Sequence, residues 1–294
     1  MLSHKIKFLI KDPIQFISNF YGDFVKDLQS KKSELPYHLI WCAGLPKSGT
    51  TLIEQIIDTL PYVQLNISAL RSFDNKELDH PHGINEQMFK SAPQNKYSFL
   101  KTHTHYNDHY EKIANKFNAR IIVSIRDLRD VMISRYYHIL SDKKHWQHNE
   151  IKNLSFENGF IKSLTYTTNV HSEMPIVYFY NWVNDWLKIL KKRDYLLLWY
   201  EDYTNDPIKY INSILNYIQC KKKSAENIQL EIQKDINEKK ISLEKNLKHY
   251  GKLKSTYRVA KTGQWQELFS ESVDSSFNSL LPGPLEDVLN KKYI

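Results

Sequence analysis

Short apolar runs alternate with amphipathic stretches along most of the chain. Mostly apolar runs predict strands buried in a sheet at residues 38–42, 119–125 and 195–199, and residues 97–101 are a further short strand candidate. Apolar residues at helical spacing predict helices at residues 52–60, 131–140, 181–190 and 206–218. Alternation of this kind favours a mostly parallel sheet covered on both faces by helices. We therefore expect a single α/β domain of the nucleotide-binding type.

The first 36 residues have a different pattern. Asp12 and Pro13 are typical of a helix start, and apolar residues then fall on one face as far as Ser30. We expect an amphipathic helix and a polar connector in residues 1–36, packed on a domain that spans residues 37–294. Membrane or partner contact is the alternative for this helix.

Composition narrows the class of ligand. The chain has 294 residues, 41% of them hydrophobic, and a formal net charge of +8. A basic chain attracts polyanions, but no dense run of Lys and Arg with interleaved aromatic residues is present. We therefore expect a highly charged small anion and no nucleic acid.

The spacing of the two cysteines and the lengths of the apolar runs indicate where in the cell the protein is expected. Cys42 and Cys220 lie far apart in the sequence and form neither a disulfide framework nor a zinc-binding pattern. No signal peptide and no apolar run of membrane-spanning length is visible. We expect a cytoplasmic protein without a transmembrane segment.

The segment from Ala43 to Thr51, with the sequence AGLPKSGTT, stands between the first predicted strand and the first predicted helix. A helix N-terminus presents unpaired N–H groups and a partial positive charge, so it favours an anion. Gly44 and Gly49 allow the backbone to curl, and Lys47 adds a mobile positive charge. Hydroxyl donors follow from Ser48, Thr50 and Thr51. The segment predicts a phosphate-binding loop.

The position of the lysine distinguishes this loop from the usual triphosphate loop. Gly44 and Gly49 have the triphosphate spacing, but Thr50 stands where the lysine belongs and Lys47 lies inside the loop. The sequence P-K-S-G-T-T resembles the 5′-phosphosulfate loop of sulfotransferases that use 3′-phosphoadenosine 5′-phosphosulfate (PAPS). The alternative is a plain turn between strand and helix.

Lys101, Thr102 and His103 follow the second predicted strand, where open α/β sheets place their sites. K-T-H at this place resembles the cytosolic sulfotransferases, and the resemblance implies that His103 is the general base on the acceptor hydroxyl. Imidazole titrates near neutrality, which suits this role. Lys101 is then expected to contact the sulfuryl oxygens. His105, two residues on, is a weaker candidate.

Arg126 ends the most apolar strand, and Ser134 follows eight residues later on the next helix. In the sulfotransferase family an arginine and a serine at this spacing hold the 3′-phosphate of PAPS. A guanidinium grips phosphate through two parallel hydrogen bonds, and a hydroxyl completes the site. The alternative is an ordinary salt-bridged helix start, because the sequence here reads Arg-Asp-Leu-Arg-Asp.

Two further segments resemble the family. Near the C-terminus, Arg258 and the Gly and Trp that follow it match a loop that holds the 3′-phosphate, while Val259 and Ala260 depart from its residue types but keep their backbone amides. Tyr200 matches a tyrosine that lies beside the adenine; alternatively it caps a strand.

The resemblance covers the chain from about residue 37 to the end and implies a reaction. A sulfuryl group passes in line from PAPS to a hydroxyl of a small-molecule or glycan acceptor, with Lys47 stabilising the leaving 5′-phosphate and with no metal. The acceptor is expected to lie among variable loops at residues 67–95 and 138–175.

Two departures from the cytosolic branch lead to separate expectations. Leu52 replaces the tryptophan that stacks on adenine, and the dimer motif of the branch is absent. We therefore expect a monomer, or a dimer through another surface such as the helix at residues 13–30.

Two rival functions remain open. A P-loop kinase for a small molecule needs a lysine after Gly49 and an acidic magnesium ligand, and Thr50 occupies the first place. A basic nucleotide- or RNA-binding module has no use for His103 beside Lys101, and it predicts salt-sensitive RNA binding.

Overall fold

The protein is represented by a computed structural model that describes residues 39–60, 63–65, 83–90, 92, 97–190, 194–221, 223–250 and 261–289. The helix expected at residues 13–30 and its connector lie outside this part of the chain. So do three of the expected site residues, namely Arg258, Val259 and Ala260.

A parallel sheet forms the centre of the described structure, with the strand order β2-β3-β1-β4-β5. Its strands are β1 (Leu39–Gly44), β2 (Val63–Leu65), β3 (Tyr97–Thr102), β4 (Arg120–Ile125) and β5 (Leu196–Trp199). β1 lies between β3 and β4, so the carboxyl ends of these three strands meet at one edge. Ala43 pairs with Thr102, and Gly44 pairs with Ser124. The predicted parallel α/β sheet is confirmed.

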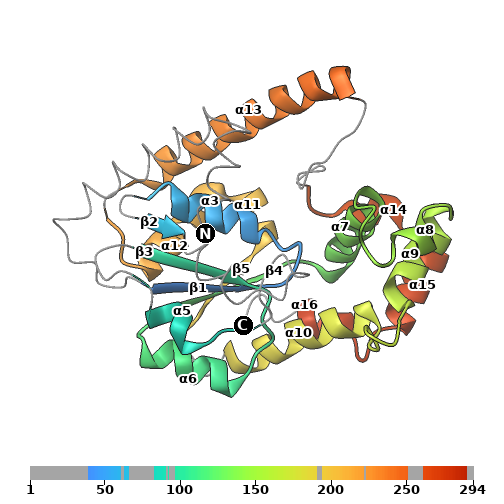
Figure 1. Cartoon of the computed structure of the whole chain (residues 1–294), viewed down its shortest axis with the longest axis horizontal. Helices are drawn as coiled ribbons and strands as arrows, with labels where there is room; N and C mark the ends of the chain where they lie inside the picture. Colours follow the sequence, from blue (N-terminus) through green and yellow to red (C-terminus); the bar gives the residue numbers. More distant parts are fainter. Residues whose placement is uncertain are drawn as a thin grey trace, which may run out of the picture.

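Side chains of β1 alternate between two hydrophobic cores, one on each face of the sheet. Trp41 and Ala43 belong to the core that includes α10, whereas Ile40 and Cys42 belong to the core that includes α3 and α12. Figure 1 shows the helices in two layers above and below the strands. Burial on both faces explains why the strands read as continuous apolar runs rather than alternating ones.

Thirteen helices of the described residues surround this sheet. They are α3 (Thr50–Asp58), α5 (Glu86–Lys90), α6 (Asp108–Lys116), α7 (Leu128–Ser141), α8 (His148–Ile151), α9 (Phe156–Thr165), α10 (Pro175–Leu190), α11 (Tyr200–Asn205), α12 (Pro207–Tyr217), α13 (Ala225–Tyr250), α14 (Gln264–Leu268), α15 (Glu271–Ser279) and α16 (Leu285–Leu289). Figure 1 shows α7, α8, α9, α14 and α15 gathered beyond one end of the sheet.

The helices differ from expectation in two regions. α10 begins at Pro175 rather than at residue 181, because proline is well tolerated at the first position of a helix. Residues 138–175, which we expected to be loops, contain the end of α7 and all of α8 and α9. The expectation that this region is made of loops is therefore wrong.

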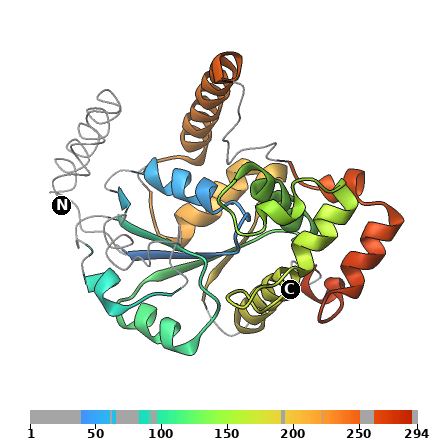
Figure 2. The same cartoon turned by 45° about the vertical axis from the view of Figure 1, so that its right-hand side comes forward.

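Helix α13 projects from the body of the molecule, as Figures 1 and 2 both show. Its first turns carry the buried Ile228 and Ile232, and Asp235 accepts a hydrogen bond from Gln55 of α3 at 3.0 Å. No helix within the described ranges is both long enough and apolar enough to cross a lipid bilayer.

Candidate functional site

The loop between β1 and α3 has two residues in the left-handed region. Lys47 has a φ of 71° and Gly49 a φ of 87°. Gly49 is the N-cap of α3, and no side chain caps this helix end. The first amides of α3 are therefore left for a ligand, as an anion site at a helix N-terminus requires.

Neighbouring side chains lie so close to Gly44 and Gly49 that only glycine fits at these two positions. A Cβ on Gly44 would lie 1.9 Å from Cγ2 of Thr50, and a Cβ on Gly49 would lie 2.4 Å from Cδ2 of Tyr200. The sequence pattern that predicted a phosphate loop thus matches a backbone that has no room for larger residues at these two positions.

Ser48 has a different place from the one we expected. Its hydroxyl donates to a backbone carbonyl, at 2.7 Å from that of Leu45 and 2.9 Å from that of Ser124, and its side chain is fully buried. The Ser48 side chain therefore ties the loop to the end of β4 rather than facing a ligand. Thr50 is also buried, and Thr51 is half-buried.

Lys47 and Arg126 bring two positive charges to the same end of the sheet. Burial and the charge of Arg126 lower the pKa of Lys47 below its ordinary value. Lys47 is therefore held in a place that opposes its charge, and an anion beside it would relieve both the repulsion from Arg126 and the loss of hydration.

Arg126 leaves the end of β4 and lies against the ring of Tyr200, with its Cζ 4.8 Å from the ring centroid. Nη2 donates to the carbonyl of Lys261 at 2.6 Å and to Oδ2 of Asp130 at 3.3 Å. Nε is buried and has no hydrogen-bond partner among the described residues. A buried N–H of this kind is expected to bind a ligand.

The sequence analysis did not single out Asp130. Its carboxylate is fully buried and accepts from the amide of Gly263 at 2.7 Å and from that of Trp265 at 3.3 Å. The guanidinium of Arg129 lies 3.4 Å from the centroid of the Trp265 indole and pairs with Asp127 at 2.6 Å. The salt-bridged helix start, which we considered as an alternative, is therefore present beside the anion site and is compatible with it.

His103 lies directly beyond β3, with Nδ1 2.7 Å from the carbonyl oxygen of Gly44. A carbonyl only accepts, so Nδ1 carries the proton in the neutral ring and Nε2 is the nitrogen that takes one up. This is the tautomer that a general base needs.

Three tryptophans donate hydrogen bonds to the segment 102–104, one to a side chain and two to the backbone. The indole of Trp41 donates to Oγ1 of Thr102 at 2.9 Å, and that of Trp182 donates to the carbonyl of His103 at 3.2 Å. Trp186 donates to the carbonyl of Thr104 at 3.1 Å. A tryptophan pattern spread over two distant segments gives no local motif, and for this reason the sequence analysis missed it.

Lys101 forms an ion pair with Glu54 of α3. The lysine side chain is 7% exposed and that of Glu54 is 27% exposed, so the pair lies at the edge of the interior. His105 packs against Tyr178 of α10, with ring centroids 4.4 Å apart. One of the three N–H donors of Lys101 is directed at Glu54, which leaves the other two for a further acceptor.

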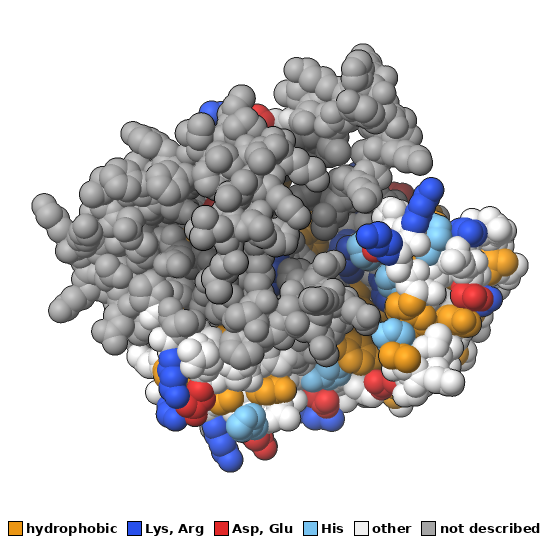
Figure 3. Space-filling view, viewed as in Figure 1, with side chains coloured by type: hydrophobic (Ala, Val, Ile, Leu, Met, Phe, Trp, Pro, Cys, Tyr) orange, Lys and Arg blue, Asp and Glu red, His pale blue; other side chains and the backbone are white. Residues whose placement is uncertain are grey.

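The structure therefore brings together several of the predicted residues at the carboxyl ends of β1, β3 and β4. These are Lys47, Gly49, Lys101, His103 and Arg126, with Tyr200 at the end of β5. Ser134 is half-buried in α7, eight residues after Arg126. Basic side chains gather right of centre on the face shown in Figure 3, with histidine and hydrophobic side chains next to them.

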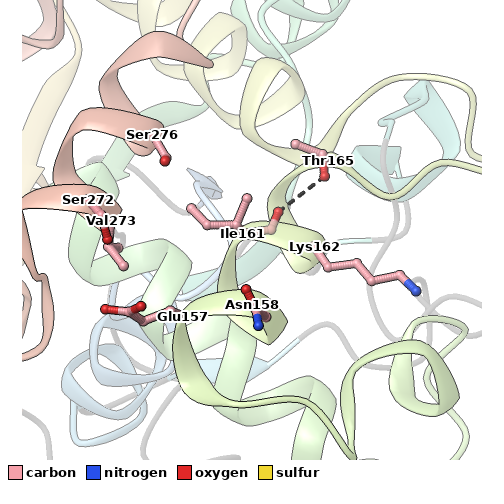
Figure 4. A pocket seen from close by; sticks show the side chains of 8 residues that line it. All are labelled: Glu157, Asn158, Ile161, Lys162, Thr165, Ser272, Val273 and Ser276. Carbon is pink, nitrogen blue, oxygen red and sulfur yellow. Dashed lines mark hydrogen bonds between the residues drawn. The ribbon is translucent and has the colours of Figure 1, made fainter.

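A groove of about 440 Å³ lies elsewhere, between α9 and α15. Figure 4 shows its lining, which consists of Glu157, Asn158, Ile161, Lys162, Thr165, Ser272, Val273 and Ser276. It includes none of the residues gathered at the strand ends, so we assign the chemistry to the strand ends. The described part of the chain holds no group of three His, Cys, Asp or Glu side chains placed to share a metal ion.

The chain is similar to known proteins in sequence pattern and in fold. The sulfotransferase domain family matches residues 38–282. No curated protein matches the chain. The crystal structure of mouse sulfotransferase SULT7A1 complexed with PAP is similar over 86% of this chain and 89% of its own, with 15% identity and a TM-score of 0.56. That of retinol dehydratase with androsterone and inactive cofactor PAP is similar over 85% of this chain and 80% of its own, with 17% identity and a TM-score of 0.52.

Proposed function

Because the chain belongs to the sulfotransferase family, we propose that it transfers a sulfuryl group from PAPS to the hydroxyl group of an acceptor. One observation carries this proposal. Lys47, whose pKa is lowered by burial and by the charge of Arg126, lies at an uncapped helix N-terminus, and the buried Nε of Arg126 has no partner among the described residues. These groups fit a nucleotide that carries anionic groups at both its 5′ and 3′ positions.

The residues divide between the two ends of such a nucleotide. Lys47 and the first amides of α3 would hold the 5′ end, and Arg126, Ser134 and the segment from Arg258 to Ala260 would hold the 3′-phosphate. Tyr200, between Gly49 and Arg126, would lie beside the adenine. PAPS supplies an activated sulfuryl group, and its leaving group is the 5′-phosphate.

His103 is the base in this proposal. Nε2 takes the proton of the acceptor hydroxyl as the acceptor oxygen forms its bond to sulfur. The bond from sulfur to the 5′-phosphate oxygen breaks, and its electron pair stays on that oxygen, where Lys47 and the α3 amides stabilise the charge. Lys101 contacts the sulfuryl oxygens during this step.

The acceptor is proposed as a chemical class rather than as a particular compound. Small hydroxyl compounds and glycans are the two classes we consider. The packing of His105, two residues after His103, on the ring of Tyr178 favours a small molecule with an apolar body. A cytoplasmic location is also a proposal, and it rests on Cys42 and Cys220, which are both buried free thiols.

A thermal shift experiment tests the proposal against both rivals. Adenosine 3′,5′-bisphosphate should raise the melting temperature without magnesium, and more than adenosine 5′-phosphate does. A kinase should respond instead to ATP with magnesium. Stabilisation by RNA that disappears with added salt would favour the binding module. Turnover would then be measured with labelled PAPS and a panel of hydroxyl compounds.

A further inference from the structure

We propose that Asp130 is a positioning residue for the 3′-phosphate: it holds Arg126 and the segment 261–265 in one fixed arrangement. This inference rests on the proposed function and adds a residue to it. Asp130 belongs to the first turn of α7 and is fully buried.

The donors around Asp130 come from two distant parts of the chain. Oδ2 accepts from Nη2 of Arg126 and from the amide of Gly263, and Oδ1 accepts from the amide of Trp265. A buried carboxylate is stable only with such donors, and charge-assisted hydrogen bonds are the strong ones. The carboxylate therefore fixes β4 and α14 relative to each other.

Two more contacts join the same segments. Arg126 donates to the carbonyl of Lys261, and Arg129 lies on the indole of Trp265. Lys261 comes three residues after Arg258 in the sequence. The residues that hold Arg126 in place thus lie directly beyond the segment expected to bind the same phosphate.

Asp130 also determines which N–H of Arg126 remains for a ligand. Nη2 is engaged by Asp130 and Lys261, whereas Nε is buried and without a partner among the described residues. Without the carboxylate the guanidinium keeps its bond to the Lys261 carbonyl but loses its second acceptor, so this N–H is held in its direction less firmly.

A positioning role and simple electrostatics predict opposite effects of Asp130→Asn on nucleotide affinity. A negative charge near a phosphate repels it, so charge alone predicts that Asp130→Asn tightens nucleotide binding. Positioning predicts the reverse, because Asn has one acceptor oxygen in place of two, so its amide nitrogen faces either the donors of Arg126 and Gly263 or the amide of Trp265.

The test compares adenosine 3′,5′-bisphosphate with adenosine 5′-phosphate by calorimetric titration. Asp130→Asn should weaken the bisphosphate about tenfold or more and the monophosphate less than about threefold. Unchanged or tighter binding of the bisphosphate, or equal weakening of both nucleotides, overturns the inference. If the wild-type protein itself does not prefer the bisphosphate, the proposed function fails rather than this assignment alone.

Asp127→Asn is the matched control. It removes the same charge from the same helix start. The remaining oxygen of Asn can still accept from the amide and from Nε of Arg129, so Arg129 should stay on the Trp265 indole. Both nucleotides should bind this variant within about threefold of wild type. A loss as large as that of Asp130→Asn would assign the effect to general charge and overturn the inference.

A measurement on the wild-type protein covers the case in which Asp130→Asn does not fold. Hydrogen exchange of the segment 261–269 is followed with each nucleotide at saturation. The bisphosphate should slow exchange in this segment more than the monophosphate does, because it binds the arrangement that Asp130 holds. Equal protection by the two nucleotides overturns the inference.

Discussion

The reactivity of His103 and Lys47 depends on their immediate neighbours. The carbonyl of Gly44 selects the His103 tautomer with the proton on Nδ1, and Arg126 together with burial disfavours the charge on Lys47. Glu54 forms an ion pair with Lys101. The two lysines and the histidine thus differ in reactivity from ordinary surface residues of the same type because of the groups next to them.

His103→Ala should lower kcat by about 10²–10⁴-fold, the usual contribution of a general base. The affinity for adenosine 3′,5′-bisphosphate should change little, because the imidazole contacts the Gly44 carbonyl and not the predicted phosphate sites. Steady-state kinetics measure kcat, and calorimetric titration measures the affinity for the bisphosphate.

His105→Ala is the comparison for that variant. His105 packs on Tyr178, so its loss should raise KM for an acceptor more than it lowers kcat. If His105→Ala loses turnover and His103→Ala keeps it, the base has been assigned to the wrong histidine.

The lowered pKa of Lys47 predicts a pH dependence of nucleotide binding. A bound anion restores the charge and raises this pKa, so binding is strongest while Lys47 is protonated in the free protein. Affinity should fall as the pH rises through the lowered pKa, at a pH below the ordinary lysine value, because binding then takes up a proton. Titrations from neutral to alkaline pH measure this.

Lys47→Arg removes the titrating group but keeps the charge, because a guanidinium stays protonated throughout this range. The alkaline fall in affinity should be absent from this variant. An identical fall in both proteins would assign the titration to another group.

At the scale of elements, two helices beside the site begin at a glycine with left-handed backbone. Gly49 caps α3 with φ of 87°, and Gly263 caps α14 with φ of 73°. They differ in their surroundings. A Cβ on Gly49 would lie 2.4 Å from the Tyr200 ring, whereas the nearest atom to one on Gly263 is 3.4 Å away, on the flexible side chain of Gln266.

Alanine at these two positions separates backbone strain from steric overlap. Gly263→Ala should lower the free energy of unfolding by about 1–2 kcal/mol, the cost of the left-handed region alone. Gly49→Ala should cost roughly 1–3 kcal/mol more, because it also displaces Tyr200. Urea unfolding measures both, and equal losses would show that Tyr200 moves aside freely.

Elements with a continuous apolar pattern were predictable, and those held by capping or tertiary contact were not. All strands that we predicted are present, because burial on both faces leaves an unbroken apolar run. α6 escaped prediction because its residues are mostly polar and its start depends on Asn107, which caps the amide of His109. α13 escaped prediction because only one side of its first turns is buried, on α3 and α12.

The candidate site was predictable as far as its motifs are local. Lys47, His103 and Arg126 each follow a strand whose apolar pattern locates it, so their meeting at one edge follows from a parallel sheet. Asp130 was hidden because two of its three donors, the amides of Gly263 and Trp265, lie more than a hundred positions later in the chain. The inward turn of Ser48 was hidden because a hydroxyl serves a ligand and a carbonyl equally well.

At the scale of the whole molecule, the predicted family is confirmed, since residues 38–282 match the sulfotransferase domain. The boundary at residue 36 and the oligomeric state stay predictions. The strand order places β1 in the middle of the sheet with β3 and β4 on either side, so the site lies at the central strands rather than at an outer edge. Substitutions at the carboxyl ends of these strands should therefore change nucleotide binding or turnover directly.

We expect the chain to sediment as a monomer, or as a dimer that involves residues 13–30. The reason is the absence of the dimer motif of the cytosolic branch, together with an amphipathic pattern that needs a surface to cover it. Sedimentation of the full chain and of a version without the first thirty residues measures this. A dimer unchanged by the truncation would exclude this helix as its interface.

The three indoles around residues 102–104 also give the protein an optical signal for its reaction centre. The indole of Trp182 donates to the carbonyl of His103 and lies beside the ring of His105, with ring centroids 6.4 Å apart. A ligand bound at His103 should therefore change the surroundings of this indole and with them its emission. Intrinsic fluorescence should change on addition of an acceptor, and Trp182→Phe should reduce that change. If so, binding at the reaction centre is visible in real time without any added label.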